Sequence, residues 1–99
     1  MPFEMLVGLQ VDDEESYRRY REQMTPMLEA AGGGFRYDFR VAETLRSNTE
    51  APINRVFAIY FPDEATMQRL FADDRYLAVK EAHYAPAVTA TTIIARYER

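Results

Sequence analysis

The chain has 99 residues, a net charge of −4, a pI near 5.0 and no cysteine. This length predicts a single domain over residues 1–99. The acidic balance disfavours nucleic acid and anionic membranes as partners, and the lack of cysteine excludes disulfides and thiolate chemistry. Because 47% of the residues are hydrophobic and 13% are aromatic, the chain has more apolar surface than a small monomer easily buries, which favours an oligomer.

The second half of the chain echoes the first half at an offset of 50 residues. Apolar residues at positions 7, 9, 11, 17 and 20 recur at positions 57, 59, 61, 67 and 70. Three charged residues also recur, namely Asp13, Glu14 and Arg19 as Asp63, Glu64 and Arg69. Each copy predicts a strand that leads directly into a capped helix.

The first half predicts a strand, a helix and a second strand. Apolar residues alternate from position 3 to 11, which is typical of a strand. Asp12 or Asp13 then caps a helix, and Pro26 predicts either a kink or a new helix capped by Thr25. Glycines at positions 32–34 end the helix, and residues 35–45 alternate again. In this second strand Phe35, Tyr37, Phe39 and Val41 are expected on one face, with Arg36, Asp38 and Arg40 on the other.

The second half repeats this order. Residues 55–61 are almost wholly apolar, which predicts a central strand. Asp63 caps the next helix, and Asp73 or Asp74 caps a further helical segment that ends before Pro86. On that segment Tyr76, Val79, Lys80 and His83 are expected on one face, and residues 88–97 form the last strand.

The resulting order β-α-β-β-α-β predicts an α+β, ferredoxin-like fold with a four-stranded antiparallel sheet. Helices then cover one face of the sheet, and the bare face needs a partner. The fold is also used by RNA-recognition motifs, whose third strand requires a glycine and stacking aromatics. Val56 and Ile59 stand at two of those positions, and the net charge is −4, so the sequence disfavours RNA binding.

His83 is the only histidine, and its ring could act as a general acid or base near neutral pH. The alternative is a histidine that stabilises the end of its helix. Arg36, Asp38 and Arg40 could pair with one another, or an arginine could bind a carboxylate. The acidic run at positions 12–15 lies where a helix start favours negative charge, so we interpret it as capping rather than as a metal site.

The chain resembles the domain-of-unknown-function 1330 family over roughly residues 5 to 97. The segments that carry the resemblance are residues 32–40, 54–57, 61–62 and 71–79, and its most specific marks are Gly33, Gly34, Arg40 and Tyr76. The resemblance implies a dimeric α/β barrel in which two sheets pack face to face. Proteins with this fold include small cofactor-independent monooxygenases and isomerases, but the family itself has no established activity.

We therefore expect a cytoplasmic homodimer with a small-molecule pocket between sheet and helices. The leading hypothesis is a metal-free enzyme acting on a small anionic or phenolic molecule, and the alternative is a noncatalytic ligand-binding or structural dimer. His83 is the predicted acid or base, Arg40 and Arg55 are predicted to hold a carboxylate or oxyanion, and Tyr37 and Tyr76 to line the pocket. We expect no cofactor, no nucleic acid and no membrane as partners.

Overall fold

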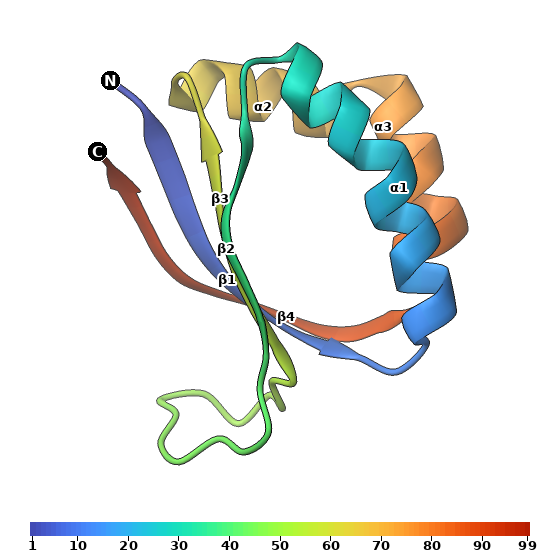
Figure 1. Ribbon diagram of the computed structural model, residues 1–99, viewed down its shortest axis with the longest axis vertical. Helices are drawn as coiled ribbons and strands as arrows, with labels where there is room; N and C mark the ends of the chain where they lie inside the picture. The colour runs from blue at the N-terminus through green and yellow to red at the C-terminus, as the bar shows by residue number, and fades with distance from the viewer.

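The computed structural model describes all residues from 1 to 99. Its strands are β1 (Phe3–Val11), β2 (Gly34–Arg40), β3 (Arg55–Phe61) and β4 (Val88–Glu98). Its helices are α1 (Glu14–Ala30), α2 (Glu64–Ala72), α3 (Asp74–Val79) and a π-helix, η1 (Lys80–Tyr84), that continues α3. The strands form one antiparallel sheet in the order β2-β3-β1-β4, and the helices all lie on one face of it (Figure 1). The predicted α+β, ferredoxin-like fold is confirmed.

The two halves of the chain form matching strand–helix units. The side chain of Asp13 accepts a hydrogen bond from the backbone N–H of Ser16, and Asp63 accepts one from Thr66 in the same way. The repeated apolar positions are all buried, on β1 and α1 in the first half and on β3 and α2 in the second half. The two strands β1 and β3 pair in the middle of the sheet. The pattern that recurs after 50 residues in the sequence is therefore also a repeat of structure.

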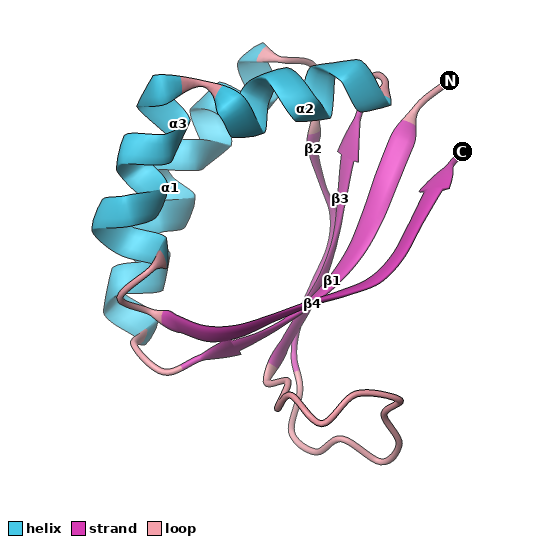
Figure 2. Cartoon of the chain, turned by 180° about the vertical axis from the view of Figure 1, so that it is seen from behind, coloured by secondary structure: helices cyan, strands magenta, loops and turns pink.

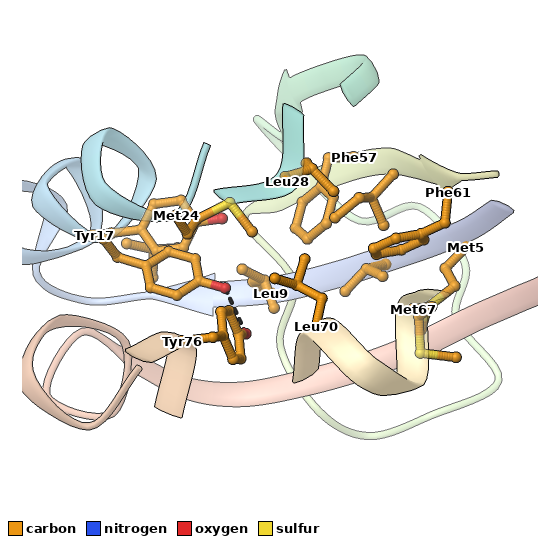
Figure 3. Packing of buried hydrophobic residues seen from close by; sticks show 14 of the residues in the cluster. Met5, Leu9, Tyr17, Met24, Leu28, Phe57, Phe61, Met67, Leu70 and Tyr76 are labelled. Atoms are coloured by element: carbon orange, nitrogen blue, oxygen red, sulfur yellow. Dashed lines mark hydrogen bonds between the residues drawn. The ribbon is translucent and has the colours of Figure 1, made fainter. Parts of the chain in front are cut away.

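The core lies between the sheet and the helices (Figure 3). Alternate residues of β1 and β3 point into it, because successive side chains of a strand face opposite sides of the sheet. Leu9 and Phe61 are fully buried there, and α1 adds Met24 and Leu28 from one helical stripe. None of the helices is long and apolar enough to cross a membrane.

The helix α1 continues through Pro26 without a break, so of the two alternatives predicted there, the new helix capped by Thr25 is wrong. A proline inside a helix removes one backbone hydrogen bond, and burial of the apolar stripe on both sides of it keeps the helix whole. The chain then reverses at Gly32, whose φ of 85° favours glycine. A Cβ at Gly33 would lie 2.5 Å from the carbonyl oxygen of Tyr60, so the helix end packs closely on β3.

The strand β2 departs from the alternation expected of it. A bulge lies between Phe35 and Tyr37, where the pairing with β3 shifts by one residue. An extra residue in a strand moves all the following side chains to the opposite face. Phe35 therefore packs on the core, whereas Tyr37 and Phe39 lie on the far face, 57% and 55% exposed. The prediction that these three aromatics share a face is wrong, and β2 ends at Arg40 rather than at residue 45.

We call the sheet face turned away from the helices the outer face. No helix covers it (Figure 2). It carries the exposed side chains of Tyr37, Phe39 and Tyr97. The connection between β2 and β3 leaves one end of the sheet, and its Ile53 packs against Gly8 of β1. The outer face is thus an aromatic surface that one chain leaves open to solvent.

Candidate functional site

A cavity of about 250 Å³ lies between the sheet and the helices. All four strands and all four helices contribute to its wall, and 12 of its 15 lining residues are hydrophobic or aromatic. The remaining three are Arg21, Lys80 and Thr91. An apolar cavity with a few converging polar groups is the usual form of a small-molecule site.

Two buried tyrosines form a hydroxyl pair inside the cavity. The hydroxyl of Tyr20 lies 2.8 Å from that of Tyr76, and both side chains are only 5% exposed (Figure 3). One hydroxyl donates to the other, so the pair keeps one O–H for a further acceptor. Burial raises the pKa of Tyr76 to about 12, and burial also raises the pKa of Tyr20. Both phenols therefore stay protonated at neutral pH and act as donors.

Arg21 was not foreseen as a site residue. Its Nε donates to the hydroxyl of Tyr17 at 2.8 Å and its Nη1 donates to Asp38 at 3.1 Å. Its Nη2 is buried without a hydrogen-bond partner, and the guanidinium lies 3.8 Å from the ring centroid of Phe35. Arg21 follows Tyr17 by four residues and precedes Met24 by three, so it falls on the buried stripe of α1. That position was the signal available in the sequence.

The predicted anion-binding arginines are held by carboxylates. Arg55 donates to both oxygens of Asp38 at 2.8 Å, and the same carboxylate accepts from Arg21. Burial opposes ionisation of Asp38, but the hydrogen bonds from Arg55 and the charge of Arg21 hold its pKa below the usual range. Arg40 is 78% exposed and lies 3.8 Å from Glu14. Neither Arg40 nor Arg55 lines the cavity, and their predicted role stays a prediction.

The row of Arg36, Asp38 and Arg40 is divided between the two faces of the sheet by the bulge. Asp38 and Arg40 pair with α1 residues on the helix side, whereas Arg36 reaches Glu4 on the outer face at 2.7 Å. The expectation that these three charges share one face is wrong.

Glu4 is a carboxylate buried on the outer face, where it is 2% exposed. Burial opposes its ionisation, yet hydrogen bonds from Tyr97, Arg36 and Arg99 outweigh this effect and hold its pKa below the usual range. Tyr37 lies on the same face, stacked on Phe39, and outside the cavity. Its predicted contact with a ligand stays a prediction.

The π-helix decides which residues of the last helical segment reach the cavity. Ala85 N–H donates to the carbonyl of Lys80, five residues back, at 2.9 Å. This wider turn brings Tyr84 to the cavity wall with Tyr76 and Lys80. The ring of His83 lies instead 3.1 Å from the side-chain amide of Gln23, outside the cavity lining. The predicted acid–base role of His83 stays a prediction, whereas Tyr76 does line the cavity.

The mouth of the cavity lies between η1 and β4. Lys80, Thr91 and Ile93 are exposed, whereas Tyr17 and Ile59 at the inner wall are buried. The hydroxyl of Tyr84 lies 2.6 Å from Oγ1 of Thr91 and bridges the two elements. No carboxylate, histidine or amide side chain lines the cavity, and no three acidic or histidine side chains group together to hold a metal ion.

Solved structures with this fold include several of unknown function. A protein from Rhodopseudomonas palustris superposes with a TM-score of 0.80 at 20% identity, over 99% of this chain and 82% of that chain. A protein from Bacteroides thetaiotaomicron, named as antibiotic biosynthesis monooxygenase-like, gives 0.68 at 18% identity, over 98% and 89%. A protein from a Jannaschia species, described as dimeric and ferredoxin-like, gives 0.56 at 14% identity, over 100% of both chains. At these identities the likeness establishes the fold alone.

A search of curated proteins finds no match. The family described as "Domain of unknown function (DUF1330)" matches residues 5–97, nearly the whole chain and the span over which the resemblance was noted. Its specific marks fall at structural positions that matter, because Gly33 packs on β3 and Tyr76 lines the cavity. The chain belongs to the DUF1330 family.

Proposed function

We propose that the chain is a homodimer that binds a small anionic or phenolic organic molecule in the cavity and acts on it without a metal. The observation that carries the proposal is the composition of the cavity wall. Its polar groups are tyrosine and threonine hydroxyls and two cations, Arg21 and Lys80, within an otherwise apolar surface. Such a wall favours a flat ligand that offers oxygen acceptors.

The outer face supports the dimeric part of the proposal. Tyr37 and Phe39 stack with ring centroids 5.8 Å apart and remain more than half exposed in one chain. Exposed apolar patches of this kind favour association, and a neighbour of the same fold is described as dimeric. Two sheets packed through their outer faces would leave the cavity of each chain open at its own mouth.

The chemistry proposed is that of a monooxygenase-like or isomerase-like enzyme. The hydroxyl pair of Tyr20 and Tyr76 is placed to donate a hydrogen bond to an oxygen on which negative charge develops. The Tyr17 hydroxyl, which accepts from Arg21, keeps its own proton for the same purpose. The alternative is a binding protein that uses the same donors and performs no reaction.

Turnover separates these two functions. The protein is incubated in air with a panel of small phenols and aromatic carboxylates, and substrate loss and oxygen uptake are followed. A monooxygenase-like enzyme consumes oxygen, an isomerase-like enzyme gives a product of unchanged mass, and a binding protein gives saturable binding with no product. Tyr76→Phe should lower turnover at least tenfold, whereas Tyr37→Phe, which removes a hydroxyl outside the cavity, should not change it. Equal activity of the two variants would contradict the placement of the site in the cavity.

A further inference from the structure

The charged side chains of the cavity wall favour ligands that carry a negative charge. Two charged side chains line the cavity, and both are cations. Arg21 lies 3.1 Å from Asp38, but this carboxylate also pairs with Arg55 at 2.8 Å, and the Nη2 of Arg21 has no hydrogen-bond partner. Lys80 is exposed at the mouth and has no carboxylate within ion-pairing distance, so it is the cavity cation that an anion entering from solvent meets first.

The π-helix aligns Lys80 with two tyrosines. Tyr76, Lys80 and Tyr84 follow one another at spacings of four residues, and all three line the cavity. Four residues of an α-helix overshoot a full turn by about 40°, so a regular helix would rotate Tyr84 away and favour position 83. A π-helical turn contains more residues, so four residues there rotate by less than a full turn. This smaller rotation offsets the excess rotation of the α-helical part and keeps Tyr84 on the same side as Tyr76 and Lys80. The Lys80 ammonium consequently lies 5.7 Å from the ring centroid of Tyr84, at the mouth.

The inner end of the cavity, formed by β2 and β3 away from β4, is aromatic and also carries Arg21, whose guanidinium lies 3.8 Å and 4.8 Å from the ring centroids of Phe35 and Phe57. Phe35 and Phe57 meet edge to face there with ring centroids 5.5 Å apart, and Tyr76 forms part of the wall with Phe71. A cavity of about 150 Å³ is large enough for benzene, so about 250 Å³ leaves room for one ring and a substituent. Aromatic walls favour a ring in this position, through edge and face contacts.

We infer that the ligand is a one-ring aromatic carboxylate, with its ring at the inner end and its carboxylate at the mouth against Lys80. The Tyr84 hydroxyl, now 2.6 Å from Thr91, is positioned to donate a second hydrogen bond to the carboxylate. A hydroxyl on the far side of the ring would reach the pair of Tyr20 and Tyr76. This inference rests on the cavity being the ligand site, as proposed above, and adds the charge and shape of the ligand.

Binding of four matched probes to the whole protein tests the inference. Benzoate is the expected ligand, benzylamine reverses the charge, benzyl alcohol removes it, and cyclohexanecarboxylate keeps the charge without the flat ring. Affinities are measured by calorimetry, and the site is located by amide chemical shifts. Benzoate should bind at least tenfold more tightly than benzylamine and benzyl alcohol, and more tightly than cyclohexanecarboxylate, with shifts around Lys80 and Tyr84.

Three substitutions locate the charge contact. Lys80→Met keeps most of the side-chain stem and should weaken benzoate binding about tenfold, as expected for loss of a charge-assisted contact. Lys80→Arg should restore most of the affinity. Arg46→Met is the matched control, because Arg46 is an exposed cation outside the cavity that also has no carboxylate partner, and it should leave binding unchanged.

Each failure has a distinct meaning. Binding of benzyl alcohol or benzylamine in the cavity as tightly as benzoate would overturn the inferred charge and keep the cavity as the site. Loss of benzoate affinity in Arg46→Met as well as in Lys80→Met would also overturn it, since the effect would then be one of net charge. If no probe perturbs the amides of the cavity wall, the inference fails, whereas the proposed function fails only if the panel of phenols also shows neither binding nor turnover.

Discussion

Removal of the Tyr76 hydroxyl tests whether the cavity wall is built around the tyrosine pair. The two oxygens lie 2.8 Å apart and both side chains are 5% exposed. Tyr76→Phe therefore leaves the hydroxyl of Tyr20 buried without its partner, at a cost of about 1–3 kcal/mol in the free energy of unfolding. Tyr20→Phe should cost a similar amount for the same reason. A loss of about 2 kcal/mol lowers the Tm of a domain of this size by about 8–16 °C.

The double variant carries the decisive information. When both hydroxyls are removed, neither tyrosine leaves an unpaired hydroxyl behind, so the double variant should be more stable than the sum of the single losses predicts, by about 1–2 kcal/mol. The measurement is urea unfolding followed by circular dichroism at one fixed protein concentration, because the stability of the proposed dimer would depend on concentration. Tyr37→Phe is the control and should change the free energy by less than about 0.5 kcal/mol. Additive losses, or no loss in Tyr76→Phe, would refute the reasoning.

Four further predictions follow from named positions. The pKa of Asp38 is lowered in the folded protein. Its ionised carboxylate therefore stabilises the fold fully above the unfolded pKa of about 3.9, and this stabilisation is lost as the pH falls through the lower folded pKa. Asp38→Asn should make the free energy of unfolding less dependent on pH in this acidic range. Phe39→Asp should convert the proposed dimer to a folded monomer, as measured by light scattering, since this side chain on the outer face is 55% exposed. Ile59→Asp, at a core position 3% exposed, should abolish folding, and a soluble folded protein would count against the core assignment. His83→Ala should change the free energy of unfolding by less than about 1 kcal/mol, because its hydrogen bond to Gln23 is exposed, and a larger loss would mark it as structural.

The fold followed from the sequence because its signals are local and repeated. The alternation of β1, the apolar run of β3 and the capping aspartates Asp13 and Asp63 each specify one element, and the same order occurs twice. Two such strand–helix units leave little freedom in how the strands pair. The buried positions agree with this order, since residues 7, 9, 57 and 59 all lie in the core.

The site was harder to predict because it depends on two irregularities that pattern alone does not reveal. The bulge after Phe35 moves the following side chains of β2 to the opposite face of the sheet. The π turn that begins at Lys80 places Tyr84, rather than His83, at the cavity wall. Each irregularity adds one residue to a regular strand or helix. Packing contacts with residues distant in sequence stabilise the irregular backbone, so a local pattern does not reveal it. Tyr76 was predicted to line the pocket and does so, whereas Tyr17, Tyr20 and Tyr84, which also line the cavity, were not predicted as site residues.

Arg21 illustrates the same limit. Its sequence position on the buried stripe of α1 was visible, but its partners Tyr17, Asp38 and Phe35 come from three different elements. Only the folded arrangement makes it a cavity residue rather than a surface arginine.

Native mass spectrometry of the protein with benzoate or 4-hydroxybenzoate added tests the central claim most directly. Each chain has a mass of 11.5 kDa. The predicted result is the mass of two chains carrying the aromatic carboxylate, with the adduct released under denaturing conditions and weakened in Lys80→Met. A monomer, or a dimer that carries neither carboxylate at concentrations that saturate binding in solution, would contradict a dimer with an anion-binding cavity in each chain.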